Sequence, residues 1–338
     1  MRKCRPDRRG GVVPVSAVGR DLYRCCGGRR FVVVDDPVKP GATVLVTGAT
    51  GFVGRAVCAC LTEAGYTVRA VGRHEVGEIH RGTDWTAVLQ GCDAVVHLAA
   101  RVHVMNGPAA GEDEDDAYRE VNLHGTATLV RQARSAGVRR FVFMSTIKVL
   151  GESGVEVRPD DPPAPYDAYA VSKTEAEAAI HDLAEDMDVV ILRPPLVYGP
   201  GVRANFERLM GLVASGWPLP FAAIRNRRSL IHVGNLADAV RHALTCRPGT
   251  YHPKDRRDLS LPELTRLIAS GMERPCRLFP VPPALMRVLG RLTGRRAAVS
   301  RLTETFTSDG SMDGWVPPVS TEDGIDKTAW SYLRRHAR

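Results

Sequence analysis

From residue 43 onward, short apolar runs alternate with helical patterns, and this alternation restricts the possible folds more than any other feature. The runs are nearly continuous in apolar residues, which is typical of strands covered on both faces. They lie at 43–47, 67–72, 93–99, 140–145 and 189–193, and the helical stretches between them at 52–64, 115–136 and 168–185. The pattern predicts an α/β protein with a Rossmann-type, doubly wound parallel sheet.

Beyond residue 200 the alternation weakens, and Pro and Gly separate shorter helical patterns. This change predicts a smaller C-terminal lobe that binds substrate beside the sheet. The short helices are expected at 235–245, 261–271 and 283–291. The predicted division is a disordered basic extension at 1–40, a Rossmann domain at 41–200 to which 229–250 return, a smaller lobe over most of 201–330, and a basic tail at 331–338.

The net charge of +8 is concentrated at the two ends of the chain. Residues 1–40 hold ten Lys/Arg against four Asp, and the last eight residues hold three Arg. The remainder is close to neutral, which argues against a nucleic-acid-binding surface. The apolar stretch near the start is short and contains Pro14, and no other stretch is long enough to span a bilayer. We expect a cytoplasmic protein with no nucleic-acid or membrane partner.

The eight cysteines show no C-x-x-C spacing and are not accompanied by a histidine cluster. Cys58 and Cys60 fall two apart in a predicted helix and so point to different faces. This usage predicts reduced thiols rather than disulfides, and it predicts no metal site.

The sequence VTGATGFVG places Gly48, Gly51 and Gly54 between the first predicted strand and the first helix. At such a junction the first glycine permits a tight turn, the second lets backbone approach a pyrophosphate, and the third allows close packing of helix on strand. The helix N-terminus adds free N–H groups that bind phosphate. We therefore predict a dinucleotide-binding site here.

The end of the second predicted strand bears on which dinucleotide is bound. NAD-binding enzymes usually have a carboxylate here, which binds the ribose 2′-hydroxyl. This chain has Gly72 followed by Arg73, and a guanidinium can bind a 2′-phosphate. The strand end favours NADP(H), with NAD(H) as the alternative.

The sequence YAVSK contains Tyr169 and Lys173, which share one face of a predicted helix. A phenol has an ordinary pKa near 10, and a nearby ammonium together with an oxidised nicotinamide ring would lower it. Thr146, at the end of the preceding strand, could bind the same substrate oxygen. The three residues predict a proton shuttle at one carbonyl or alcohol, with hydride transfer by the nicotinamide.

Several motifs together resemble the extended short-chain dehydrogenase/reductases. They are the glycine triplet, HLAA (97–100), VNLHGT (121–126), STIKVLG (145–151), the Tyr169/Lys173 pair and RPPLVYGPG (193–201). Within that family the chain is similar to UDP-hexose 4-epimerases and to UDP-4-keto-6-deoxy-N-acetylhexosamine 4-reductases of bacterial polysaccharide clusters. The resemblance covers residues 43–300 and implies a UDP-sugar substrate and a possible homodimer.

The resemblance also implies roles for individual residues. Thr146, Tyr169 and Lys173 would be catalytic, with Lys173 also holding the cofactor ribose. The residues implied in cofactor binding are Gly48, Thr50, Gly51, Phe52, Val53, Gly54, Arg73, Leu98, Ala99, Ala100, Asn122, Tyr169, Lys173, Pro194 and Val197. Those implied in substrate binding are His103, Thr146, Lys148, Asn205, Arg228 and Arg301. Residues 306–315 look shorter than the corresponding family segment, so the resemblance does not determine how the rim of the sugar site is built.

The residues after Thr146 separate this chain from the related 4,6-dehydratases, in which an Asp-Glu pair performs elimination. Here Ile147 is inert and Lys148 is cationic, so dehydration lacks its acid and base. Two redox reactions remain. The favoured prediction is reduction of a UDP-4-keto-6-deoxy-hexosamine, and the alternative is a UDP-hexose 4-epimerase with tightly bound NAD. A third hypothesis is a catalytically silent NADP-binding sensor or scaffold.

Overall fold

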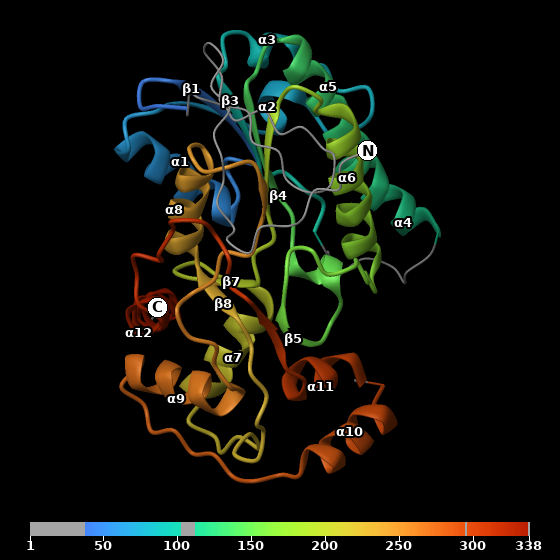
Figure 1. Cartoon of the computed structure of the whole chain (residues 1–338). Helices are drawn as coiled ribbons and strands as arrows, with labels where there is room; N and C mark the ends of the chain where they lie inside the picture. The colour runs from blue at the N-terminus through green and yellow to red at the C-terminus, as the bar shows by residue number, and fades with distance from the viewer. Residues whose placement is uncertain (1–37, 103–111, 295, 337–338) are drawn as a thin grey trace, which may run out of the picture. The chain divides into compact units, whose positions relative to one another are not determined.

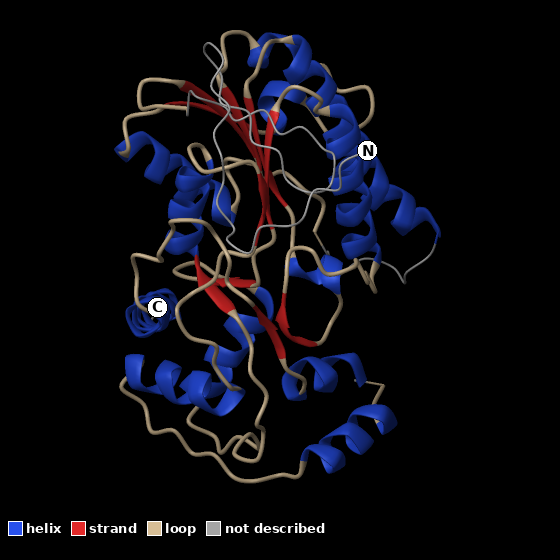
Figure 2. Ribbon diagram, viewed as in Figure 1, coloured by secondary structure: helices blue, strands red, loops and turns tan. Residues whose placement is uncertain are grey.

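A computed structural model describes residues 38–102, 112–294 and 296–336. A six-stranded, fully parallel sheet forms its centre (Figures 1 and 2). In spatial order its strands are β2 (Thr67–Val71), β1 (Thr43–Thr47), β3 (Ala94–His97), β4 (Arg140–Met144), β6 (Asp188–Leu192) and β9 (Gly249–Tyr251). All five predicted strands belong to it, which confirms the predicted fold class. The sixth, β9, is too short to show a periodic signal.

Helices cover both faces of this sheet, which explains why its strands lack polar alternation. Figure 1 shows α1 (Phe52–Glu63) and α8 (Val233–Ala243) on one side, and α5 (Thr126–Ser135) and α6 (Ala168–Leu183) on the other. One hydrophobic cluster joins the sheet to α1 and α8, and another joins it to α5 and α6. The single helix predicted at 115–136 is α4 (Glu112–Arg119) and α5, joined by a π-helical segment, Glu120–Gly125.

The strand order determines where a ligand can bind. Because β2 and β3 flank β1 on opposite sides, successive connections diverge at the carboxyl end of β1. Such a divergence opens a crevice in doubly wound sheets, and ligands bind there. Gly48 follows β1 and Ala99 follows β3, so the predicted cradle lies at this point.

A second group of helices and short strands forms a separate hydrophobic cluster after residue 195. Its largest helices are α7 (Ala204–Ala214), α9 (Leu261–Gly271) and α12 (Thr321–His336). Helix α9 begins with a capping box between Ser260 and Glu263, then presents apolar residues to the cluster. Two pairs of short strands lie outside the central sheet: β7 (Leu196–Tyr198) with β8 (Leu230–His232), and β5 (Gly154–Val157) with β10 (Phe306–Ser308). Four further short helices of the described residues are α2 (Arg73–Val76), α3 (Thr86–Leu89), α10 (Pro283–Leu292) and α11 (Arg296–Thr303).

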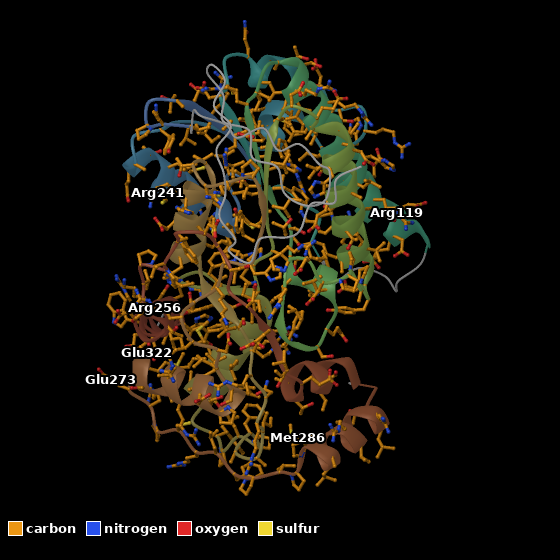
Figure 3. All side chains as sticks on the ribbon, viewed as in Figure 1. Arg119, Arg241, Arg256, Glu273, Met286 and Glu322 are labelled. Atoms are coloured by element: carbon orange, nitrogen blue, oxygen red, sulfur yellow. The ribbon has the colours of Figure 1, made fainter. Side chains whose placement is uncertain are left out.

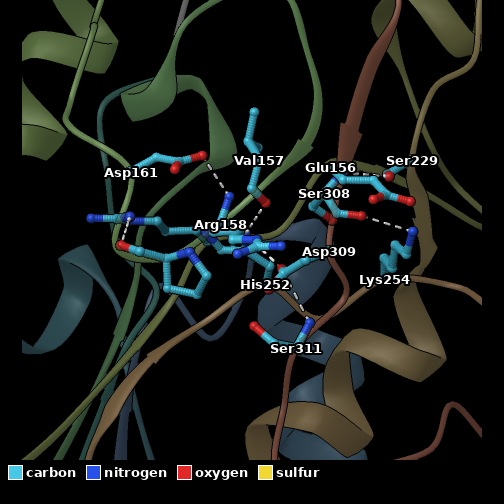
Figure 4. A network of polar contacts seen from close by, with 12 residues as sticks. Glu156, Val157, Arg158, Asp161, Ser229, His252, Lys254, Ser308, Asp309 and Ser311 are labelled. Carbon is cyan, nitrogen blue, oxygen red and sulfur yellow. Dashed lines mark hydrogen bonds and ion pairs between the residues drawn. The ribbon is translucent and has the colours of Figure 1, made fainter.

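The segment 306–315, which looked short in the sequence, is held by an extensive polar network (Figure 4). Lys254 Nζ donates to the Ser308 carbonyl at 2.9 Å and to both carboxylate oxygens of Asp258 at 3.0 Å. The Asp309 amide donates to the Val157 carbonyl at 3.1 Å. The segment thus connects the β5–β10 pair to the residues after β9.

The two ends of the described chain correct or extend the sequence prediction. Val38, inside the predicted extension 1–40, is 2% exposed and belongs to the sheet core; residues 1–37 lie outside the described residues. At the other end, the sequence prediction gave no conformation for the basic tail 331–338, and residues 331–336 belong to α12, where Ile325, Ala329 and Tyr332 recur on one face and pack into the cluster of α7, α9 and α12. The proposed boundaries between the sheet domain and the lobe remain a prediction.

Among the described residues, no helix is long and apolar enough to cross a membrane. The predicted cytoplasmic location remains a prediction.

Candidate active site

The three glycines after β1 form a turn with no room for side chains. A Cβ on Gly54 would lie 2.1 Å from the Gly48 carbonyl oxygen, and one on Gly48 would lie 2.8 Å from the Ala99 amide. Gly48 also has φ +66°, which favours glycine. The N-terminus of α1 is capped by Gly51 without a side-chain hydrogen bond, so its amides remain available to a ligand. The cradle therefore fits a pyrophosphate.

The neighbours of the cradle have different surroundings. Thr50 is exposed, and its carbonyl accepts a 2.7 Å hydrogen bond from Arg55. Phe52 is partly buried against the hydrophobic cluster of α7, α9 and α12, whereas Val53 is partly buried against the sheet core. Helix α1 is therefore anchored on both sides, which keeps its N-terminus in place.

The end of β2 carries a carboxylate that the sequence interpretation missed. The Gly72 amide donates to Glu75 Oε2 at 2.7 Å, and this bond caps the N-terminus of the short helix α2. Arg73 points elsewhere: its Nε lies 3.2 Å from Glu78 Oε1, and its side chain is 81% exposed. The sequence contained a signal for this carboxylate, because a glutamate three residues after an N-cap residue often accepts from the N-cap amide.

Asn122 links the segment after β3 to helix α6. Its Oδ1 accepts from the Arg101 amide at 2.8 Å, and its Nδ2 donates to Ser172 Oγ at 3.0 Å. Ala99 donates its amide to Thr47 Oγ1 at 3.2 Å, which holds the ends of β1 and β3 together. Leu98 packs against the sheet core, and Ala100 follows at intermediate exposure.

Tyr169 and Lys173 lie on the first two turns of α6, which Asp167 caps by accepting from the Ala170 amide. Lys173 is 1% exposed, and its Nζ donates to the Met144 carbonyl at 2.8 Å and lies 4.3 Å from the centre of the Phe143 ring. Burial lowers the pKa of Lys173 to about 7, although Glu177 acts in the opposite direction.

Burial also raises the pKa of Tyr169, and the nearby Asp167 raises it further. The sequence argument expected a lowered pKa with the cofactor bound, whereas the protein alone keeps this phenol protonated at neutral pH.

Thr146 and Lys148 come from the end of β4. Thr146 caps the 3₁₀ turn Ile147–Leu150, and Lys148 Nζ lies 3.0 Å from Asp167 Oδ2 and 5.9 Å from the centre of the Tyr169 ring.

A buried ion pair beneath these residues was not predicted. Glu177 accepts from Arg193 Nη2 at 2.6 Å and Nε at 3.0 Å, and both side chains are 7% exposed. Glu177 also accepts from the Ser145 hydroxyl. The spacing in the sequence could have indicated that Glu177 lies beneath the site, because Tyr169, Lys173 and Glu177 recur every four residues and so share one face of α6.

The remaining predicted residues are dispersed. The Pro194 carbonyl accepts from the Ile147 amide at 3.1 Å, and Val197 pairs with Ile231 in the β7–β8 ladder. Asn205 is exposed at the start of α7, and the Arg228 amide donates to the Leu259 carbonyl at 2.9 Å. Arg301 belongs to α11, with its side chain outside the description, and His103 lies outside the described residues. The cofactor-binding roles of Pro194 and Val197 remain predictions, as do the substrate-binding roles of the other four residues.

Residues 44–253 match the NAD dependent epimerase/dehydratase family. The chain is also 40% identical to a UDP-glucose 4-epimerase of Vibrio cholerae over 89% of this chain and 98% of that protein. The chain belongs to the NAD dependent epimerase/dehydratase family. The family predicted from the motifs is therefore confirmed, and with it the prediction of an NAD(P)-binding enzyme.

The chain is also similar, at lower identity, to two other 4-epimerases. An N-acetyl-α-D-glucosaminyl-diphospho-ditrans,octacis-undecaprenol 4-epimerase of Escherichia coli O157:H7 is 24% identical over 84% of this chain and 93% of its own length. The structure of a UDP-glucuronic acid 4-epimerase from Bacillus cereus, in complex with UDP-glucuronic acid and NAD, superposes with a TM-score of 0.67. It is 22% identical, covers 87% of this chain and 99% of its own, and shares the fold.

Proposed function

We propose that this epimerase/dehydratase is an NAD-dependent UDP-hexose 4-epimerase. The observation that carries the proposal is the 40% identity to the Vibrio cholerae UDP-glucose 4-epimerase, which extends over 89% of this chain and 98% of the relative. The matched length includes both the dinucleotide cradle and the lobe where a sugar would bind. The Tyr169, Lys173 and Thr146 set lies within it and supports catalysis rather than a silent sensor.

NAD fits the end of β2 better than NADP(H), which the sequence interpretation favoured. Glu75 lies at this strand end with its Oε2 2.7 Å from the Gly72 amide, and a carboxylate there accepts a ribose hydroxyl and repels a 2′-phosphate. Arg73, the residue that suggested a phosphate contact, lies against Glu78. Two similar folds bound to NAD, named as MoeE5 complexes with UDP-glucose and UDP-glucuronic acid, agree with this choice.

The protein's own residues account for the proton chemistry at C4 of the sugar. The bound dinucleotide supplies a hydride acceptor and a positively charged ring. Tyr169 is protonated in the protein alone, and it would act as a phenolate once that positive ring and Lys173 lower its pKa and its own proton passes to solvent. The phenolate then takes the proton from the C4 hydroxyl and later returns it to the oxygen. Thr146 binds that oxygen through its hydroxyl, and Lys173 holds the cofactor ribose. Ile147 and Lys148 provide no carboxylate for proton abstraction at C5, so the sugar keeps its C6 hydroxyl.

During 4-epimerisation the keto sugar must rotate so that the hydride returns to the opposite face of C4. The residues that select the hexose are therefore placed in the lobe rather than at Tyr169. Arg228 is the proposed pyrophosphate contact, from the segment before β8. Its amide donates to the Leu259 carbonyl, and the residue is half-buried. Which hexose is bound depends on contacts that this segment and α7 would provide.

The test begins with the cofactor content of the purified full-length chain. An epimerase releases about one equivalent of NAD on denaturation and interconverts UDP-glucose with UDP-galactose, or the N-acetylated pair, without added cofactor. The undecaprenol-linked N-acetylglucosamine diphosphate is assayed beside the UDP-sugars. A chain that is empty of NAD, and that oxidises NADPH when a UDP-4-keto-6-deoxy sugar is added, would establish the reductase and overturn the proposal.

A further inference from the structure

Helix α10 exposes an apolar face. Leu285 and Val288 are each 50% exposed and Leu292 is 79% exposed. At about 100° per residue these three positions fall within an arc of roughly 60°, so they form one stripe. Met286, labelled in Figure 3, lies on a different side and is partly buried against the lobe cluster. The helix is therefore seated on the lobe through Met286, and its apolar stripe faces away from the seat.

Positive charge accompanies this stripe. The segment 274–303 contains seven arginines and no Asp, Glu or Lys. Two of them, Arg287 and Arg291, are exposed on α10 itself, one turn apart. On the helical wheel Arg291 lies about 60° from Val288 at the edge of the stripe, whereas Arg287 lies about 100° from Val288. Arg291 therefore borders the stripe, and Arg287 reaches the same side only through its long side chain. The net charge of the whole chain concealed this cluster, because acidic residues elsewhere balance it.

An exposed apolar stripe bordered by arginines matches the surface of an anionic bilayer. Apolar side chains insert at the level of the acyl boundary while the guanidinium groups bind lipid phosphates. A second copy of the chain fits less well, because a two-fold contact would bring the same arginines against one another. Figure 1 shows α10 at the end of the lobe that is remote from the sheet, so a membrane can reach it without covering the cradle.

We propose that α10 attaches this protein peripherally to anionic membranes, with Leu285, Val288 and Leu292 inserted and Arg287 and Arg291 on the head groups. The attachment does not span the bilayer, and it departs from the sequence expectation of no membrane partner. It is independent of the proposed epimerase activity, since neither the stripe nor the two arginines belong to the candidate active site.

The experiment is cosedimentation of the full-length chain with vesicles of equal parts phosphatidylglycerol and phosphatidylcholine, against vesicles of phosphatidylcholine alone. We expect binding to the anionic vesicles. The double variants Leu285→Ser/Leu292→Ser and Arg287→Ser/Arg291→Ser should each weaken partitioning by about tenfold or more. The matched control Arg131→Ser/Arg247→Ser removes the same charge from exposed sites outside α10 and should change partitioning by less than about threefold.

Each other outcome overturns the proposal. Equal loss in the control pair would assign binding to net charge, and unchanged binding in both α10 variants would assign it to the basic ends, which all variants retain. A solution dimer that the leucine variant dissociates would assign the stripe to a second copy. Thermal melts establish that every variant is folded, and the arginine pair tests the helix even if the leucine pair destabilises it.

Discussion

At the residue scale, the proposed chemistry depends on the Tyr169 hydroxyl. Tyr169→Phe keeps the ring and removes the proton carrier, so turnover should fall by about 10²–10⁴ while cofactor content is unchanged. Thr146→Val should cost less, because it removes a positioning hydrogen bond and leaves the proton carrier in place. Tyr251→Phe, which removes a hydroxyl on β9, is the control. Steady-state kinetics of sugar interconversion measures the turnover of each variant. A Tyr169→Phe variant that keeps more than about a tenth of the parent activity would contradict the role of Tyr169 as proton carrier.

Lys173 links the site to the pH dependence of stability. Its folded pKa of about 7 lies below the ordinary lysine value near 10.4, so between these values the unfolded chain binds the extra proton. The contribution of Lys173 is therefore most favourable above pH 10 and is lost as the pH falls through 7. As the pH rises through this window, the unfolding free energy of the parent should increase, relative to that of Lys173→Met, by up to about 1.4 kcal/mol per pH unit. Urea denaturation from pH 7 to 9 measures the difference, and a flat difference would contradict the shifted pKa.

The choice of cofactor also depends on single side chains. Glu75→Gln removes the negative charge at the end of β2 but keeps a hydrogen-bond acceptor for the Gly72 amide. We expect discrimination between NAD and NADP(H) to move toward NADP(H), measured by binding of each dinucleotide to cofactor-free protein. Arg73→Ala should leave NAD binding nearly unchanged, because Arg73 pairs with Glu78. A large loss of NADP(H) binding in Arg73→Ala, with no effect of Glu75→Gln, would restore the sequence interpretation.

At the element scale, the junction of β1 and α1 is set by contact distance. Gly54→Ala would bring a Cβ to 2.1 Å from the Gly48 carbonyl oxygen, so the helix must move away from the strand. We expect loss of dinucleotide binding together with a lower melting temperature. Gly72→Ala is the control at the neighbouring strand end, where the nearest atom to a Cβ is 3.6 Å away and φ is −130°. Equal melting temperatures for the two variants would show that the junction can relax.

At the scale of the whole molecule, Val38 is the first residue that the structure describes, and it belongs to the sheet core. Val38 donates its amide to the Leu244 carbonyl at 3.2 Å and accepts from the Tyr66 hydroxyl at 3.0 Å, and its side chain is buried. Deleting residues 1–37 should therefore leave the melting temperature and activity unchanged. Deleting 1–38 should cost roughly 1.5–3 kcal/mol through the lost apolar burial alone. Denaturant unfolding of both truncations tests this boundary, and a matched stability of the two would remove Val38 from the core.

Much of the fold and part of the site follow from local sequence patterns. The apolar runs and helical spacing predicted five of the six sheet strands, because burial on both faces leaves a continuous apolar signal. The glycine triplet and the Tyr169/Lys173 spacing are likewise local, since one turn or one helix face brings each set together. The strand pattern also placed Thr146 at the end of a strand, where the structure has it after β4 with its side chain accepting from the Lys148 amide, and the family resemblance added its expected catalytic role.

What the sequence left undecided depends on residues that meet only when the chain folds. Arg140, at the start of β4, donates to the carbonyls of Ala243 and Cys246, more than 100 positions along the chain, and no periodic pattern encodes such a partner. No periodic pattern encodes the partner of Arg193, beneath Lys173, or of Arg73 either. The conformation of one turn decides whether Arg73 contacts a ligand phosphate or Glu78. Periodicity specifies which side of an element is buried, whereas the identity of a buried charge's partner is set by the packing of distant elements.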